Sequence, residues 1–365
     1  MGGYILKRIF YMVPTLLGIL TVNFFVIQLA PGGPVEQVIS KMQGDRRSVL
    51  ERITGQDGDL VSTPDTSLNR VNRYKGASGV SPEMIREIEK QFGFDKPVHE
   101  RYLDMLKSYL CFDFGESFFR DRKVVDIILE KMPVSISLGL WSTLLIYGIS
   151  IPLGIRKAVN HGTRFDVWSS TVVILMNSIP VFLFAVLLIT VFAGGSYLQW
   201  FPLRGLVSPG FESLSFWGKA ADYLHHLCLP ILAMSIGGIA GLALLTKNSF
   251  LEEINKLYVV TARAKGVTEK RILLGHVFRN AMIIVISGLP ATFVSIFFTG
   301  SMMIEVIFSL DGMGLLGFES TMQRDYPVMF ANLYIGLLMG LVLKIISDIT
   351  YVWVDPRISF DESEV

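Results

Sequence analysis

Long apolar segments without charged residues constrain this chain more than any other feature. Crossing about 30 Å of hydrocarbon takes roughly 20 consecutive apolar residues in a helix. Six segments meet that length, and the first five contain no Asp, Glu, Lys or Arg: 9–30, 134–155, 169–193, 227–246, 281–304 and 328–354. Only 18% of the residues are charged, whereas soluble domains average about a quarter. The sequence therefore predicts an all-α membrane protein with six transmembrane helices.

The first apolar segment is expected to remain as a helix. Lys7 and Arg8 precede it, as in a signal peptide. Its apolar stretch is too long for one, and it leads into Ala30-Pro31-Gly32-Gly33-Pro34 without a small-residue cleavage site. We therefore predict that residues 1–30 form the N-terminus and the first transmembrane helix.

The distribution of basic residues predicts the orientation, because short cytoplasmic loops are enriched in Lys and Arg. With six spans, both termini and the second and fourth connections lie on one side of the membrane. The long segment 31–133 is not counted, because long loops do not follow this rule. That side holds Lys7, Arg8, Arg156, Lys157, Arg164, Lys247, Lys256, Arg263, Lys265, Lys270, Arg271, Arg279 and Arg357. The other side holds Arg204, Lys219 and Arg324. We expect both termini, including the tail 355–365, to lie in the cytoplasm.

Charges and helix breakers within the spans suggest a polar interior. Lys344 and Asp348 are four residues apart and share one helix face. They either neutralise each other near the inner end of the last helix, as a possible intramembrane ion pair, or line a pathway that relays protons. Prolines interrupt five spans and are tolerated where neighbouring helices or a water-filled cavity satisfy the backbone: Pro14, Pro152, Pro180, Pro230 and Pro290. Plain helix packing explains any one of them equally well.

The segment 31–133 is predicted to be a small helical extracytoplasmic domain between the first two spans. Residues 41–80 are polar and poor in aromatics, which is typical of a mobile loop. Ser81-Pro82-Glu83 has the composition of a helix start, and that helix is expected to end near Gly93. Amphipathic helices are predicted over 99–110 and 124–132. The latter is expected to lie on the membrane surface before Pro133 turns the chain inward.

Several classes of site are excluded or left open by the residues present. The chain has no basic stripe with interleaved aromatic residues, so the sequence does not favour nucleic-acid binding. Cys111 and Cys228 make neither a disulfide framework nor a metal site, and whether they pair is left open. His225 and His226 are expected to meet water or headgroups at an interface. No Gly-x-x-x-x-Gly-Lys-Ser/Thr phosphate loop occurs, so any ATP must be bound elsewhere. We predict no catalytic residues and no metal ligands.

The longest inner connection, about 247–280, is strongly basic and is predicted to contain two short helices. Residues 258–265 favour a helix that ends at Gly266, and Thr268 is placed to start the next one. A compact projection of this kind can transmit force from a soluble partner. A basic loop that only fixes topology is the alternative on composition alone.

Resemblance favours the first interpretation. Thr261-Ala262-Arg263-Ala264-Lys265-Gly266, followed by His276-Val-Phe-Arg-Asn-Ala281, resembles the coupling loop of dipeptide and oligopeptide ABC importer permeases. The wider superfamily pattern is Glu-Ala-Ala, three residues, Gly, nine residues, then Ile-x-Leu-Pro. This chain has Val260-Thr-Ala262, three residues and Gly266, so it keeps the glycine and one alanine. The departures are typical of the peptide branch.

Six further blocks resemble the same branch and occur in the same order. They are Phe92-Gly-Phe-Asp-Lys-Pro97, Asp113-Phe-Gly-Glu-Ser117, Glu305-Val-Ile-Phe-Ser309, Gly312-Met-Gly314, Arg324-Asp-Tyr-Pro327 and Asp355-Pro-Arg357. The likeness covers nearly the whole chain. The enlarged segment 31–133 is most similar to the Yej-type permeases, whose family takes up oligopeptides and the peptide-nucleotide antibiotic microcin C.

The resemblance implies a type I ABC importer permease fold and a multi-subunit complex in the bacterial inner membrane. The segment 134–354 would hold transmembrane helices two to six. Partners would be a second permease of different sequence, two ATP-binding subunits and an extracytoplasmic peptide-binding protein. ATP and Mg would be held by those partners, so this chain is expected to bind no cofactor and to catalyse no reaction. Thr261, Ala262, Arg263, Ala264, Lys265 and Gly266 would couple the ATPase to the pathway.

Two other classes of function remain as alternatives at this point. An ion-coupled secondary transporter would use Lys344 and Asp348, although such proteins often contain internal repeats and none is evident. An intramembrane hydrolase needs a nucleophile beside a base, yet neither Gly-x-Ser-x-Gly nor His-Glu-x-x-His occurs. The residues do not indicate peptide length or sequence preference, the lining of the pathway, or the identity of the second permease.

Overall fold

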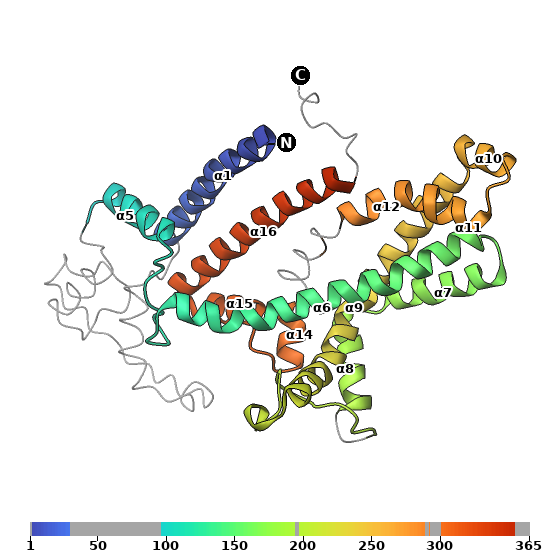
Figure 1. The fold of residues 1–365 in the computed structure, drawn as a ribbon. Helices are drawn as coiled ribbons and strands as arrows, with labels where there is room; N and C mark the ends of the chain where they lie inside the picture. Colours follow the sequence, from blue (N-terminus) through green and yellow to red (C-terminus); the bar gives the residue numbers. More distant parts are fainter. Residues whose placement is uncertain (1, 30–95, 194–196, 289–291, 293–300, 355–365) are drawn as a thin grey trace, which may run out of the picture. The chain divides into compact units, whose positions relative to one another are not determined.

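The computed structural model describes residues 2–29, 96–193, 197–288, 292 and 301–354 (Figure 1). This part is mostly helical, and the only β pairing within it is an isolated bridge between Glu116 and Lys123. Its helices are α1 (Gly2–Leu29), α5 (Val98–Leu110), α6 (Val124–Val159), α7 (Arg164–Ser178), α8 (Val181–Phe192), η1 (Phe211–Ser213), α9 (Phe216–Ile254), α10 (Leu257–Ala264), α11 (Glu269–Ile272), the π-helix η2 (Leu273–Val277), α12 (Phe278–Ser287), α14 (Ser301–Ile307), α15 (Met313–Gln323) and α16 (Tyr326–Val354). The expected loop at 41–80 and helix at 81–93 lie outside the described residues.

The chain divides into two compact units, one of Pro14–Gly115 and one of Met1–Val13 with Glu116–Val365. In the Pro14–Gly115 unit, α5 confirms the helix predicted over 99–110. Its Tyr102 hydroxyl lies 2.7 Å from Thr21 Oγ1, and the Tyr102 and Phe24 rings are 5.3 Å apart. Tyr109 packs against Phe114, and burial raises the pKa of the Tyr109 phenol. Aromatic packing therefore holds α5 against the second half of α1.

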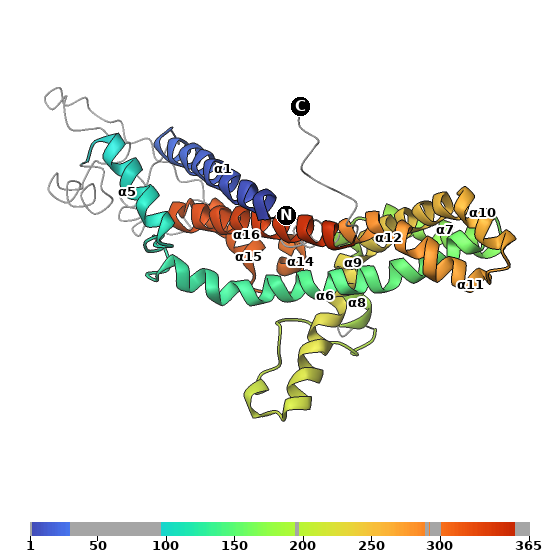
Figure 2. The ribbon, with the colours of Figure 1, turned by 45° about the horizontal axis from the view of Figure 1, so that its top comes forward.

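The core of the larger unit is the pairing of α6 with α9, whose C-terminal halves lie side by side (Figures 1 and 2). Hydroxyl groups join the two helices: Ser150 Oγ donates to the Ile239 carbonyl at 3.1 Å, and Ser235 Oγ to the Ser142 carbonyl at 3.4 Å. Small residues and interhelical hydroxyl bonds are typical of helix pairs packed within a membrane.

Gly154 fixes the closest approach of these two helices. A Cβ at this position would lie 2.5 Å from Thr246 Cβ and 2.8 Å from the Ala243 carbonyl oxygen. We expect Gly154→Ala to destabilise the α6–α9 pair by about 1–3 kcal/mol, because overpacking forces the backbones apart. The measurement is the thermal unfolding midpoint in detergent. Gly148→Ala is the control, since nothing lies within 4 Å of a Cβ there; equal midpoints for both variants would contradict the close approach.

The structure corrects the expected turn at Pro133. The helix predicted over 124–132 does form, but it does not end there. It continues through Pro133 as the 36-residue α6. Proline removes the backbone donor that would bond the Leu129 carbonyl, and its ring crowds the preceding turn, yet the helix is continuous across this position. The buried contacts of Val124, Ile127 and Ile128 hold the first turns in line with the rest.

The span predicted as one helix over 169–193 is also different in the structure. It is broken into α7 and α8, which meet at an angle of 96°. Ile179 adopts an extended conformation (φ −85°, ψ 120°) immediately before Pro180. The ring of a proline disfavours the helical conformation of the residue before it, which explains the position of the break.

Four of the described helices are long and apolar enough to cross a membrane, or five if the bent α7–α8 pair forms one span. The spans predicted at 9–30, 134–155, 227–246 and 328–354 correspond to α1, α6, α9 and α16. The remaining predicted span, 281–304, begins in α12 and ends in α14, with its middle outside the described residues. The described chain is therefore a multi-pass helical membrane protein.

Candidate functional site

The predicted coupling residues lie in a compact segment, 257–277, formed by α10, a turn, α11 and η2. Gly266 has φ +77°, a left-handed conformation that glycine adopts without steric cost. The Gly266 amide donates to the Arg263 carbonyl at 3.0 Å, and the Val267 amide to the Ala262 carbonyl at 3.2 Å. The predicted stop at Gly266 is confirmed. Thr268 precedes α11 as predicted, but its side chain makes no capping hydrogen bond.

One face of the 257–277 segment is built into the core. Val259 and Val277 are fully buried, and Ile272 is nearly so. They belong to the same hydrophobic cluster as Ile146 of α6 and Phe250 of α9. A displacement of this segment is therefore coupled mechanically to the long helices, because close-packed side chains cannot slide independently.

Polar contacts fix the shape of the segment. Arg263 donates from Nε and Nη2 to the two carboxylate oxygens of Glu269, at 2.5 and 3.1 Å, and so joins α10 to α11 across the turn. Arg263 also lowers the pKa of the Glu269 carboxyl. At the base, the Tyr258 hydroxyl donates to Glu253 at 2.6 Å and accepts from Asn280 Nδ2 at 3.3 Å. Burial is the main cause that raises the pKa of the Tyr258 phenol.

The opposite face of α10 is an exposed stripe of apolar and small side chains. Leu257 is 83% exposed and Val260 is 52% exposed. Thr261 and Ala264 are exposed as well. These positions are three or four residues apart, so they lie on one face of the helix. We call these four residues the α10 stripe.

The predicted set thus divides between two faces. Thr261, Ala264 and Gly266 point away from the core, together with Lys265, whereas Ala262 is half-buried against it. Leu257 and Val260 were absent from the predicted set. Helical periodicity from Thr261 and Ala264 would have found them, but two apolar residues in a membrane protein were equally consistent with burial.

A buried charge cluster lies where α6, α7 and α9 meet. Asp166 of α7 pairs with Lys247 of α9 at 2.8 Å and with Lys157 of α6 at 3.4 Å. The Lys157 side chain is fully buried and also donates to Ser169 Oγ at 3.0 Å and Ser170 Oγ at 2.6 Å. Since a buried charge is stable only with such partners, this cluster fixes the packing of the three helices.

Three of the other motif blocks meet their neighbours through buried polar contacts. Ser117 Oγ and the Phe118 amide both donate to the buried Asp325 carboxylate, the latter at 3.2 Å. Glu305 is fully buried; it accepts from Ser135 Oγ at 3.1 Å and from the Leu315 amide at 2.6 Å, at the start of α15. These contacts therefore hold the α15–α16 turn against Ser117 and Phe118, which precede α6, and connect Glu305 of α14 to Ser135 of α6 and to the start of α15.

Lys344 and Asp348 are on the same helix, α16, but Asp348 forms its ion pair with Arg8 of α1, at 3.2 Å. Among the described ion pairs, none joins Lys344 to Asp348. His225 Nε2 lies 2.7 Å from the Trp200 carbonyl and His226 Nδ1 2.9 Å from the Asp222 carbonyl. Cys111 and Cys228 are free thiols. No cluster of potential metal ligands occurs in the described part of the chain.

Comparisons with known proteins agree with this arrangement. The family described as "Binding-protein-dependent transport system inner membrane component" matches residues 150–360. Inner membrane ABC transporter permease protein YejB of Escherichia coli O157:H7 is 58% identical over 99% of this chain and 100% of its own length. Peptidoglycan transport system permease protein YejB of Agrobacterium fabrum is 54% identical over the full length of both. Oligopeptide transport system permease protein AppB of Bacillus subtilis is 31% identical over 99% of this chain and 100% of its own.

The fold also has a counterpart among solved structures. A chain of the MetNI methionine ABC transporter, in an inward-facing conformation, aligns with 63% of this chain and 97% of its own length, with a TM-score of 0.50 and 17% identity. At that identity the likeness concerns the fold, which is that of a type I ABC permease.

Proposed function

The chain belongs to the family of binding-protein-dependent transport system inner membrane components, and from that premise we propose that it couples peptide movement to ATP hydrolysis in separate subunits. It is the permease subunit of an ATP-driven importer of the inner membrane. Its substrate class is peptides, as the names of the oligopeptide relatives suggest; the Agrobacterium relative, named for peptidoglycan, extends that class to peptide-containing wall fragments.

The complex contains this chain, a second permease of different sequence, two ATP-binding subunits and an extracytoplasmic peptide-binding protein. Six spans place both termini and the 257–277 segment in the cytoplasm, and the segment 31–133 outside. ATP and Mg are held by the partner subunits, and this chain carries no catalytic residue. The basic residues of the inner connections support this orientation.

The observation that carries the coupling proposal is the two-faced build of the 257–277 segment. Its inner face is packed into the core shared by α6, α9 and α12. Its outer face, the α10 stripe, exposes Leu257 and Val260 to solvent. Large apolar side chains in a compact projection are typical of protein interfaces. The stripe docks in a groove of an ATP-binding subunit, and closure of the ATPases moves the helix bundle through this contact.

Mutation of the α10 stripe tests the proposal. Leu257→Glu introduces a charge into the docked face and is expected to lower recovery of the ATP-binding subunits with the tagged chain by about tenfold or more, because a central apolar contact contributes 2 kcal/mol or more at an interface. The stability of the chain should change by less than about 0.5 kcal/mol, since Leu257 makes almost no contact within it. The measurement is co-purification in detergent together with the thermal midpoint.

Leu103→Glu is the matched control, because Leu103 is also exposed, at 60%, but lies on α5. Recovery of the ATP-binding subunits should then match the wild type. Undiminished recovery with Leu257→Glu, at unchanged stability, would show that the α10 stripe is not the docking face.

A further inference from the structure

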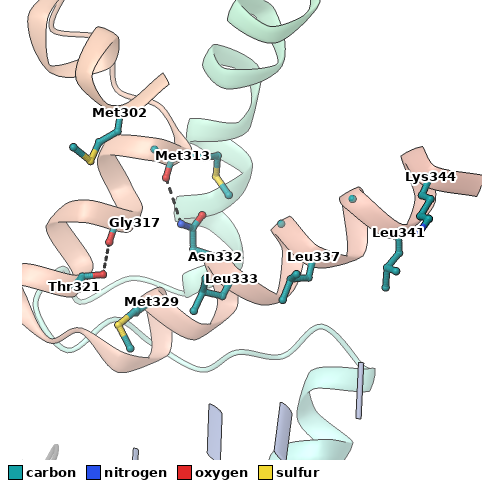
Figure 3. A pocket seen from close by; sticks show the side chains of 13 residues that line it. Met302, Met313, Gly317, Thr321, Met329, Asn332, Leu333, Leu337, Leu341 and Lys344 are labelled. Atoms are coloured by element: carbon teal, nitrogen blue, oxygen red, sulfur yellow. Dashed lines mark hydrogen bonds between the residues drawn. The ribbon is translucent and has the colours of Figure 1, made fainter. Parts of the chain in front are cut away.

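A groove of about 790 Å³ runs along α16 and is bounded by α14 and α15 (Figure 3). Methionine, leucine and glycine form most of its wall. Three side chains are polar: Thr321, Asn332 and Lys344. All lining residues belong to the unit of Met1–Val13 with Glu116–Val365. Neither the coupling segment nor the buried charge cluster contributes to it.

Lys344 gives the groove a positive charge at one end. It lies within the apolar span Tyr326–Thr350. Asp348, one turn further along α16, is paired with Arg8 at 3.2 Å, and within the described chain no ion pair includes Lys344. A charge inside a span usually faces a partner or a water-filled cavity. Lys344 faces the groove (Figure 3), so this cation is available to an anionic ligand.

The other end of the groove offers uncharged hydrogen-bonding groups. The Asn332 side chain lies beside the Met313 carbonyl, and the Thr321 hydroxyl donates to the Gly317 carbonyl (Figure 3). Asn332 precedes Lys344 by 12 residues on α16. At 1.5 Å per residue, the two positions are about 18 Å apart along the helix. An extended peptide spans this length with about five residues.

The wall between the two ends suits side chains of varied shape. Met302, Met313 and Met329 line it, and methionine adapts to irregular partners because its side chain is unbranched and flexible. Gly336 and Gly340 of α16 also line it, and positions without side chains leave room for a peptide backbone to approach.

We infer that this groove binds the carboxyl-terminal residues of a peptide substrate in extended form, with the terminal carboxylate at the Lys344 ammonium group. The inference rests on the proposed function, that the complex imports peptides. It adds an orientation and a recognition element: a free carboxylate is bound and an amidated terminus is not.

The test uses the assembled complex, purified without the peptide-binding protein so that the binding protein's own preference does not enter. A photoreactive pentapeptide with a free carboxyl terminus is cross-linked, and the same unlabelled peptide competes as the free acid or as the carboxyl-terminal amide. In the wild type, the free acid should compete about tenfold better, because a charge-assisted bond to a carboxylate is lost in the amide. Peptide mapping should place the label on Met302, Met313 or Met329.

Lys344→Met and Lys344→Gln should remove the difference between acid and amide, whereas Lys344→Arg should keep it. A preference that persists in both neutral variants, or a label that maps outside the groove, would overturn the inference. Cross-linking that no peptide displaces, with bound phospholipid recovered from the groove, would overturn it in favour of a lipid. ATP-driven peptide uptake by the wild type in vesicles is measured separately; its absence would refute the proposed function instead.

Discussion

Replacing Gly266 with tryptophan is expected to leave the chain folded but to reduce ATP-driven peptide uptake by about tenfold or more, since a single central interface position can contribute 2 kcal/mol or more. A Cβ at Gly266 meets nothing within 4 Å, so a side chain can leave the backbone there without an immediate clash. The left-handed φ of +77° adds roughly 1–2 kcal/mol of local strain for a residue with a side chain. That strain falls on an exposed turn, whereas the indole occupies the surface beside the α10 stripe. ATP hydrolysis should then lose its dependence on peptide.

Gly266→Asn separates strain from steric obstruction. Asparagine adopts the left-handed conformation more readily than other residues with side chains, and it is much smaller than tryptophan. Its uptake should stay within about twofold of the wild type, a difference of less than 0.5 kcal/mol. The measurement is peptide uptake into vesicles per assembled complex. Wild-type uptake by a fully assembled Gly266→Trp complex would contradict the coupling role of this turn.

Removing the carboxylate of Asp166 is expected to give the largest loss of stability among single substitutions outside the apolar core. Asp166 is the acidic partner of both Lys157 and Lys247. Without it, the fully buried Lys157 ammonium keeps only hydroxyl and carbonyl acceptors from α7. Breaking a buried ion pair by deleting one partner typically costs about 3–5 kcal/mol. Asp166→Ala should therefore lower the thermal midpoint strongly and loosen α7 from α6 and α9.

The double variant Asp166→Ala with Lys157→Met provides the control. An apolar side chain of similar length replaces the stranded charge, and such replacements of buried pairs are often neutral. Most of the lost stability should return, although Lys247 keeps its own charge at 13% exposure. If Asp166→Ala unfolded at the wild-type midpoint, the cluster would not hold the three helices together.

The sequence predicted the long helices and the 257–277 turn because each has a strong local signal. Length and hydropathy alone identify α9 and α16 as spans. Gly266 is needed where a left-handed residue ends α10, and that requirement is local too. The helix over 99–110 follows from its amphipathic spacing. In each case the neighbouring residues determine the structure.

The features that were missed depend on contacts between distant segments. Pro133 and Pro180 are both prolines in apolar helices, yet α6 continues through the first and the helix breaks at the second. Buried contacts of Val124, Ile127 and Ile128 hold the first turns of α6 in place, and residue spacing does not encode such tertiary contacts. Asp348 pairs with Arg8, more than 300 positions away, although Lys344 was its nearest cation along the chain.

The exposed face of α10 likewise could not be predicted from the neighbouring sequence alone. The resemblance gave Thr261, Ala264 and Gly266, but only the structure separates the buried Val259 from the exposed Leu257 and Val260. Apolar residues two positions apart on a short amphipathic helix face opposite ways, and which way is inward depends on where the core lies. The α10 stripe could therefore be defined only once α10 was packed against α6 and α9.

Isolation of the tagged chain from its native membranes, with an ATPase assay on what is recovered, shows whether this chain works as the permease of an ATP-driven complex. We expect a second permease and ATP-binding subunits to be recovered with it, and a peptide-loaded binding protein to stimulate hydrolysis. A chain that is recovered alone and moves peptide under a proton gradient without ATP would contradict it.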